Sequence, residues 1–84
     1  MVKAIKFEKN GCKPCEVVGE YLKNNDLADK VEVVNIFEKP ETAIKYGVMG
    51  VPAFMVVDED GKELERVVGQ NTDAIADLIE KYNI

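Results

Sequence analysis

The only two cysteines of the 84-residue chain, Cys12 and Cys15, stand in the segment Gly11-Cys12-Lys13-Pro14-Cys15-Glu16. Cysteines at this spacing serve as a redox couple, as half of a metal site or as two small buried side chains. A structural zinc site takes four ligands from Cys, His and carboxylate groups. This chain has no histidine and no third cysteine, so a metal would need acidic ligands or a second chain. We therefore favour a redox couple and expect no metal site.

The two cysteines lie where a predicted strand gives way to a predicted helix. Residues 2–7 alternate apolar and polar side chains, which is typical of a half-buried strand, and Asn10-Gly11 follows as a turn. From Pro14 the apolar residues recur at helical spacing, and proline fits the first turn because its missing N–H costs nothing there. Cys12 therefore falls at the helix N-cap or just before it. A CxxC that opens a helix in a βαβ unit favours thiol redox chemistry over two incidental cysteines.

This position gives Cys12 a reason to be reactive. Unpaired N–H groups and the positive end of the helix dipole stabilise an anion there, and Lys13 adds a positive charge. Both effects favour the thiolate, which is the nucleophilic form, whereas the negative charge of Glu16 opposes it. Cys15 lies one helical turn further on the same face, so its sulfur can reach that of Cys12 and close a small ring. Cys12 would attack a substrate disulfide, and Cys15 would release the product from the mixed disulfide.

The rest of the chain predicts a mixed sheet. The β-branched residues 31–36 indicate a second strand, and the continuous apolar run 53–57 indicates a strand buried on both faces. Residues 58–61 form a hairpin turn, after which residues 62–68 return as a fourth strand. The expected order is β-α-β-α-β-β-α, with helices on both faces of the sheet, in one α/β domain over residues 1–84.

Three helices are expected to cover this sheet. The first closes at residues 24–26, the second is opened by Pro40 and ended by Gly47, and the third is capped by Asn71-Thr72. Their apolar positions recur at helical spacing and should face the core. These positions are Val17, Val18, Tyr21, Leu22, Ala43, Ile44, Tyr46, Ala74, Ile75, Leu78, Ile79 and Tyr82.

Composition excludes several classes of function. Sixteen acidic and eleven basic side chains give a net charge of −5, which repels phosphate backbones, so we expect no nucleic-acid binding. No apolar run approaches the roughly 18 residues that a membrane span needs. The first ten residues interrupt every short apolar stretch with Lys or Glu, unlike a signal peptide. We expect a monomer in the cytoplasm, where a CxxC is more often catalytic or metal-binding than a structural staple.

In several of its segments the chain resembles the thioredoxin family. Cys12-Lys13-Pro14-Cys15 matches the CxPC active site of that family, with Lys in place of the usual Gly. Residues 34–36, 43–52 (AIKYGVMGVP), 58–61 and 67–69 match its later segments in order and spacing. The combination is far more specific than CxxC alone. The resemblance implies a minimal thioredoxin fold, a four-stranded mixed sheet with three helices. The chain lacks the leading strand and helix of the family, and in compactness it resembles glutaredoxins and the small thioredoxin-like proteins of archaea and phages.

The same resemblance assigns a substrate-binding surface. It implies a cis peptide bond at Val51-Pro52, packed against the CxxC, which exposes the backbone of Val51 to an extended substrate. An ordinary trans proline starting a strand is the alternative. Gly69 would leave room for substrate beside the sulfurs, or would simply end a strand. The substrate-binding residues expected in all are Lys13, Pro14, Gly50, Val51, Pro52 and Gly69.

The chain departs from the family pattern beneath the cysteines. Thioredoxins usually carry a buried Asp six residues before the first cysteine, paired with a lysine on the next strand. Here Lys6 and Val33 stand at those positions, so the group that takes the proton from Cys15 is missing. We expect the long stem of Lys6 to reach solvent, and stabilisation of the thiolate by its charge is the alternative. Gly11 replaces the aromatic residue that usually precedes the first cysteine.

The resemblance implies a thiol–disulfide oxidoreductase that reduces protein disulfides through a Cys12–Cys15 dithiol. No bound cofactor is implied, because electrons would come from NADPH through a thioredoxin reductase. Oxidised proteins such as ribonucleotide reductase would receive them. Two alternatives stay open, a glutathione-linked glutaredoxin-like enzyme and a non-catalytic binding module.

Overall fold

The computed structural model describes all residues from 1 to 84, and its element order confirms the predicted β-α-β-α-β-β-α. One short 3₁₀ turn, Ala28–Lys30, lies before the second strand and was not predicted. None of the helices has the length and the apolar composition of a membrane span. The strands and helices are β1 (Lys3–Glu8), α1 (Lys13–Asn24), β2 (Val31–Asn35), α2 (Pro40–Lys45), β3 (Ala53–Val57), β4 (Glu63–Val68) and α3 (Thr72–Lys81).

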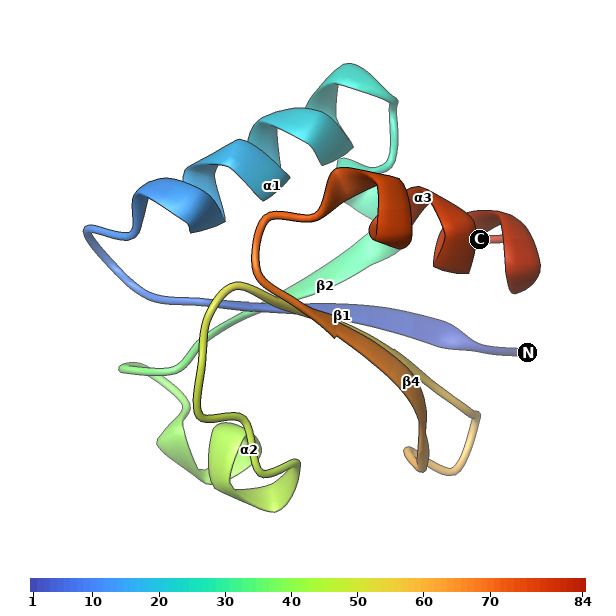
Figure 1. The fold of residues 1–84 in the computed structure, drawn as a ribbon. Coiled ribbons are helices and arrows are strands. Elements are labelled where there is room, and N and C mark those ends of the chain that lie inside the picture. The colour runs from blue at the N-terminus through green and yellow to red at the C-terminus, as the bar shows by residue number, and fades with distance from the viewer.

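The four strands form one mixed sheet in the order β2-β1-β3-β4. β1 pairs with β2 in parallel, and β3 is antiparallel to both β1 and β4. Helices α1 and α3 cover one face of the sheet and α2 covers the other (Figure 1). The chain therefore has the three-layer arrangement that the alternating strand and helix patterns predict.

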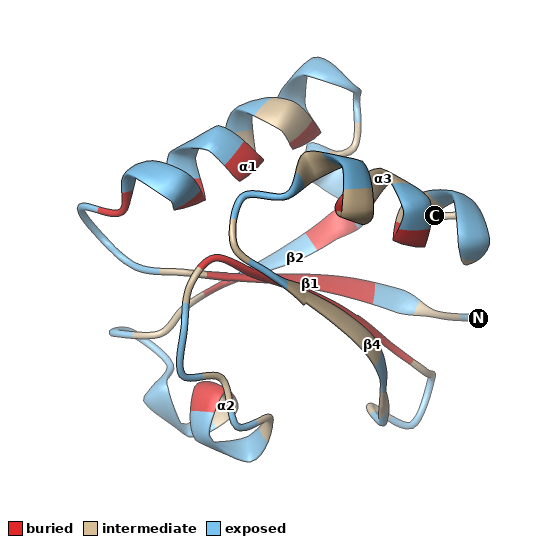
Figure 2. Ribbon diagram, viewed as in Figure 1, coloured by how far each residue is buried: buried red, intermediate tan, exposed pale blue.

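Each face of the sheet has its own hydrophobic core. Consecutive strand residues point to opposite faces, so Ala4 packs with α1 and α3 while Ile5 packs on the α2 side. All five residues of β3 are buried, as the continuous apolar run predicts, and β3 and β1 are the two inner strands of the sheet. Exposed residues lie mostly on the outer sides of the helices and in the loops (Figure 2). This rigid central layer fixes the ends of the strands, where the site lies.

The prediction that Ile44 faces the core is wrong. Its side chain is 79% exposed, and Ala43 is the buried residue of α2. The reason is the length of α2, because a helix of only six residues presents less than two turns to the sheet. Val17 of α1 is also exposed, whereas Val18 and Leu22 are buried as predicted.

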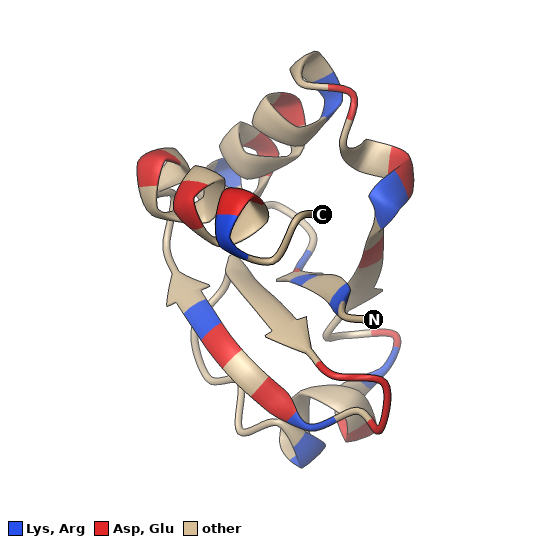
Figure 3. Ribbon diagram, turned by 90° about the vertical axis from the view of Figure 1, so that its right-hand side faces the viewer, with Lys and Arg blue, Asp and Glu red and all other residues tan.

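The edge strand β4 carries charged side chains of both signs along its length (Figure 3). Arg66 pairs with Glu63 within the strand, and Lys81 of α3 pairs with Glu65 at 2.6 Å. Charged side chains on an edge strand discourage pairing with the edge of another chain.

Candidate active site

Cys12 is the N-cap residue of α1, as the sequence predicts. Its backbone is extended, with φ of −109° and ψ of 103°, and the helix begins at the next residue. The backbone N–H of Cys15 donates a hydrogen bond to Cys12 Sγ over 3.2 Å. A free N–H at the positive end of a helix is therefore directed at this sulfur, an arrangement that stabilises a thiolate.

Cys12 and Cys15 form a disulfide in the structure, with their Cα atoms 5.2 Å apart. Both residues are nearly buried, Cys12 with 6% and Cys15 with 3% of its surface exposed. The loop that carries Cys12 connects β1 to α1 at one end of the sheet (Figure 1). The site thus combines a closed dithiol couple with the electrostatics of a helix N-terminus.

The Val51–Pro52 peptide bond is cis, and it lies at the same end of the sheet as the cysteines. Ala53, the next residue, pairs in register with Phe7 of β1 and with Val68 of β4. Since β1 leads from Phe7 toward Cys12, the strand register brings Pro52 to the same end of the sheet as the disulfide. Gly69 follows Val68 and is brought to the same end.

Val51 has unused backbone hydrogen-bonding groups. Neither its N–H nor its C=O takes part in a backbone hydrogen bond, although Gly69 on the neighbouring strand donates to the carbonyl of Pro52 at 2.8 Å. A side chain at Gly69 would meet no atom within 4 Å, and one at Gly50 would lie 3.5 Å from Val68 Cγ1. The structure therefore leaves open space beside an unpaired stretch of backbone.

Arg66 holds the segment that leads into this cis bond. Its guanidinium donates hydrogen bonds to the carbonyl oxygens of Tyr46 and Gly47, where α2 ends. The same guanidinium bonds both carboxylate oxygens of Glu63, at 2.6 and 2.7 Å, and thereby lowers the pKa of that carboxyl group. Arg66 of β4 therefore holds the beginning of the loop that leads from α2 to Pro52.

Lys6 is buried, contrary to the expectation that its stem reaches solvent. Only 6% of its side chain is exposed, and its ammonium donates a hydrogen bond to Glu8 Oε1 at 2.7 Å. The reason is that Glu8, two residues further on the same face of β1, supplies an anionic partner. Gly19 of α1 leaves the space that the ammonium fills.

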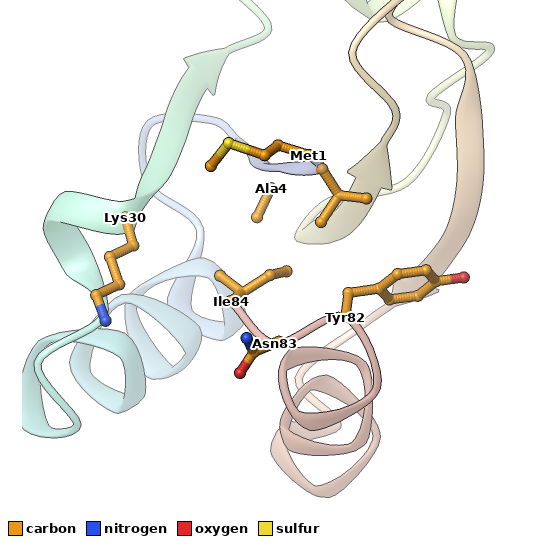
Figure 4. Close-up of a pocket in the computed structure, with 7 residues that line it drawn as sticks. Met1, Ala4, Lys30, Tyr82, Asn83 and Ile84 are labelled. Carbon is orange, nitrogen blue, oxygen red and sulfur yellow. The ribbon is translucent and has the colours of Figure 1, made fainter.

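Two hollows are present on the surface. One, of about 270 Å³, is lined by Lys13, Glu16, Val17 and Glu20 on α1, beside the cysteines. The other, of about 350 Å³, lies at the opposite end of the molecule near both chain termini, with Lys30 and Tyr82 on opposite sides of it (Figure 4). The larger hollow is therefore separate from the dithiol.

Some residues near the site were not predicted. Met49 is 97% exposed and Val68 is 57% exposed, although both are large and apolar. Met49 precedes Gly50 and Val68 precedes Gly69 in the sequence. Their position next to two predicted site residues is the signal that could have revealed them. Glu8 was also missed, because it matters here as the hydrogen-bond acceptor for Lys6, and the burial of Lys6 is visible only in the folded chain.

Comparisons with known proteins identify the family to which the chain belongs. A family model described as thioredoxin matches residues 2–81. The SPbeta prophage-derived thioredoxin-like protein YosR of Bacillus subtilis is 32% identical over 95% of this chain and 98% of its own length. Thioredoxin of B. subtilis is 37% identical, over 84% of this chain and 72% of its own. The solved structure of reduced thioredoxin pre-protein from Schistosoma mansoni superposes with a TM-score of 0.83 at 26% identity, covering 95% of this chain and 77% of that one. The chain therefore belongs to the thioredoxin family, and with its Cys12–Cys15 disulfide it is a thiol–disulfide oxidoreductase.

Proposed function

We propose that the reduced chain reduces disulfide bonds in proteins, with Cys12 as the attacking thiolate and Cys15 as the resolving thiol. The observation that carries this assignment is the hydrogen bond from the Cys15 N–H to Cys12 Sγ at the N-cap of α1. That donor stabilises negative charge on Cys12 and not on Cys15, so Cys12 is the better nucleophile and the better leaving thiolate.

The substrate is a polypeptide in extended conformation. The unpaired N–H and C=O of Val51 can each form a hydrogen bond with the main chain of a substrate, so binding accepts many sequences. Gly50 and Gly69 leave room for that chain, and exposed Met49 and Val68 offer apolar contact. Exposed Lys13 and Pro14 complete the substrate-binding surface. Pro52 is buried, so it contributes only by holding the backbone of Val51 in place.

Electrons reach the disulfide from NADPH through a thioredoxin reductase, and the dithiol passes them to oxidised proteins such as ribonucleotide reductase. The protein acts as a monomer in the cytoplasm and needs no bound cofactor. This proposal rests on membership of the thioredoxin family. Two sulfurs suffice for the exchange, because two electrons move as one disulfide opens and another closes.

An insulin-reduction assay with three alternative electron sources tests the proposal. With NADPH and thioredoxin reductase we expect catalytic turnover, and with the Cys12→Ser variant none. Turnover with glutathione alone would identify a glutathione-linked enzyme instead. Failure with thioredoxin reductase, glutathione and dithiothreitol alike would contradict catalysis and leave a binding module.

A further inference from the structure

Beneath α1 the structure holds an ion pair, between buried Lys6 and partly exposed Glu8, that the dithiol chemistry described above does not use. Lys6 Nζ lies 2.7 Å from Glu8 Oε1, and the two side chains are 6% and 30% exposed. Removing an ammonium from water is unfavourable unless it is paired, and the pair seldom stabilises the fold more than apolar residues would. A buried lysine with a carboxylate partner, beneath the helix that carries the two cysteines, is therefore a candidate for a role in the reaction.

The pair lies on the face of β1 that α1 covers. Ala4, which shares that face with Lys6 and Glu8, packs in one cluster with Val18 and Leu22 of α1. A methyl group added to Gly19 would lie 3.1 Å from Lys6 Nζ, so the ammonium is in contact with the helix at that residue.

The direction of the two elements then places Glu8 near the resolving cysteine. β1 runs toward the Cys12 loop and α1 runs back over it (Figure 1). Four residues of helix from Gly19 back to Cys15 span about 6 Å, and two residues of strand from Lys6 on to Glu8 span about 6.6 Å. The Glu8 carboxylate, 2.7 Å from Lys6 Nζ, therefore lies beneath the turn of α1 that joins Cys15 to Gly19, within about one helical turn of Cys15.

We propose that Glu8 accepts the proton of Cys15 and that Lys6 is the residue that positions Glu8. This inference rests on the roles proposed above for Cys12 and Cys15. Cys15 has only 3% of its surface exposed, so bulk water reaches its thiol poorly. Glu8 is partly exposed and connects the buried thiol to solvent.

The proton moves in the second half of the exchange. After Cys12 has attacked, a substrate sulfur is joined to Cys12 Sγ and the other substrate sulfur has left as a thiolate, which solvent protonates. Glu8 takes the proton from Cys15 Sγ, and the Cys15 thiolate attacks Cys12 Sγ. The Cys12–substrate bond breaks as the Cys12–Cys15 bond forms, and the second substrate thiolate leaves. The dithiol has lost two electrons, the substrate disulfide has gained them, and Glu8 returns its proton to the leaving thiolate or to water.

No charged residue pairs in register with Lys6 or Glu8, and Glu65, which lies on this face of β4, is paired with Lys81. The register partners of Lys6 are Val33 and Phe54, and the partner of Glu8 on β2 is Asn35. The helices that cover this face carry their charges on the outside. These exposed residues are Lys13, Glu16, Glu20, Lys23, Asp73, Asp77, Glu80 and Lys81.

The test separates the two halves of the exchange. The reduced full chain reacts with dithiobis(nitrobenzoate), an aromatic disulfide whose thiolate is coloured. The first coloured thiolate is released when Cys12 attacks the reagent, so its rate of release is proportional to the reagent concentration. The second is released when Cys15 resolves the mixed disulfide, so its rate of release does not depend on that concentration. In Glu8→Gln, which keeps an oxygen acceptor for Lys6, we expect the second release to slow roughly tenfold to a hundredfold near neutral pH. The first release should change by less than about twofold, since Glu8 acts only on Cys15.

The pH profile distinguishes proton transfer from a structural defect. In the variant the second release should rise with pH through the range where thiols ionise, about 8.5, and approach the wild-type rate above it. A structural defect would lower the rate equally at every pH.

Glu32→Gln is the matched control. Glu32 also pairs with a lysine, Lys3, at 2.8 Å, but its register partner Ile5 places it on the opposite face of the sheet. We expect both releases to stay unchanged in this variant. Glu8→Asp supplies a second test should Glu8→Gln fold poorly, because it retains a carboxylate and should keep most of the rate near neutral pH.

Two outcomes overturn the proposal in different ways. Suppose that the wild type shows both releases and that the rate of the second release in Glu8→Gln is within about twofold of the wild-type rate near neutral pH. Glu8 then takes no part in the proton transfer, and the proposed function stands. Absence of a second release in the wild type removes the resolving role of Cys15, and with it both proposals.

Discussion

The backbone N–H of Gly69 donates a hydrogen bond to the carbonyl oxygen of Pro52 over 2.8 Å. This bond joins the end of β4 to the residue before β3, at the end of the sheet where the disulfide lies. It fixes the carbonyl side of Pro52 while Val51, on the other side of the cis bond, keeps its N–H and C=O unpaired. The bond between Gly69 and Pro52 therefore fixes the loop, while the N–H and C=O of Val51 remain available to a partner.

Replacing Gly69 with alanine should destabilise the fold. Gly69 has φ of +98°, a conformation that side chains with a Cβ adopt only at a cost of roughly 1–2 kcal/mol. Urea unfolding should show this loss in the free energy of unfolding. Gly50→Ala is the control, because its Cβ would make only ordinary contact with Val68, and it should change stability by less than about 0.5 kcal/mol. Equal losses in both variants would contradict the account.

Replacing Arg66 with glutamine should lower stability in a pH-dependent way. The guanidinium lowers the pKa of Glu63, so the folded state binds fewer protons than the unfolded state in acid. The stabilisation is fully present above the unfolded pKa of about 4.3 and is lost as pH falls through the lower folded value. We therefore expect a loss of about 1–3 kcal/mol at neutral pH that shrinks below about pH 4.

Chemical unfolding at a series of pH values measures this difference. Lys62→Gln removes an equal charge from an exposed neighbour that makes no ion pair, and it should leave the pH dependence unchanged. If the loss in Arg66→Gln did not vary with pH, Arg66 would act through the carbonyls of Tyr46 and Gly47 alone.

Truncation of two isoleucines on helices should affect stability to very different extents. Ile75 of α3 is fully buried against the sheet, so Ile75→Ala should cost about 2–5 kcal/mol through lost burial and a cavity. Ile44 of α2 is 79% exposed, so Ile44→Ala should change the free energy of unfolding by less than about 0.5 kcal/mol. A large loss at Ile44 measured by urea unfolding would show that α2 packs against something further.

Local patterns in the sequence predicted most of the fold. The run Ala53–Val57 is continuous and apolar, and it is the buried central strand. The spacing of Cys12 and Pro14 predicted the N-cap, because capping depends on residues within one turn. The prediction for Ile44 failed because helical spacing alone does not reveal how short a helix is or how much of it the sheet covers.

The details beneath and beside the site could not be predicted, because each depends on elements that meet only in the fold. Lys6 is buried because Glu8 supplies its partner and Gly19 of another element supplies the space. Arg66 caps α2 from a strand 20 residues away in sequence. No local pattern marks either contact.

The central claim is that Cys12 attacks and Cys15 resolves, and trapping of the mixed disulfide tests it most directly. Each single variant, Cys12→Ser and Cys15→Ser, is reduced, mixed with a peptide that contains a disulfide, and weighed by mass spectrometry without reductant. We expect Cys15→Ser to carry the mass of one peptide half on Cys12 and Cys12→Ser to remain unmodified. A stable adduct on Cys15 in Cys12→Ser, with none in Cys15→Ser, would contradict the account.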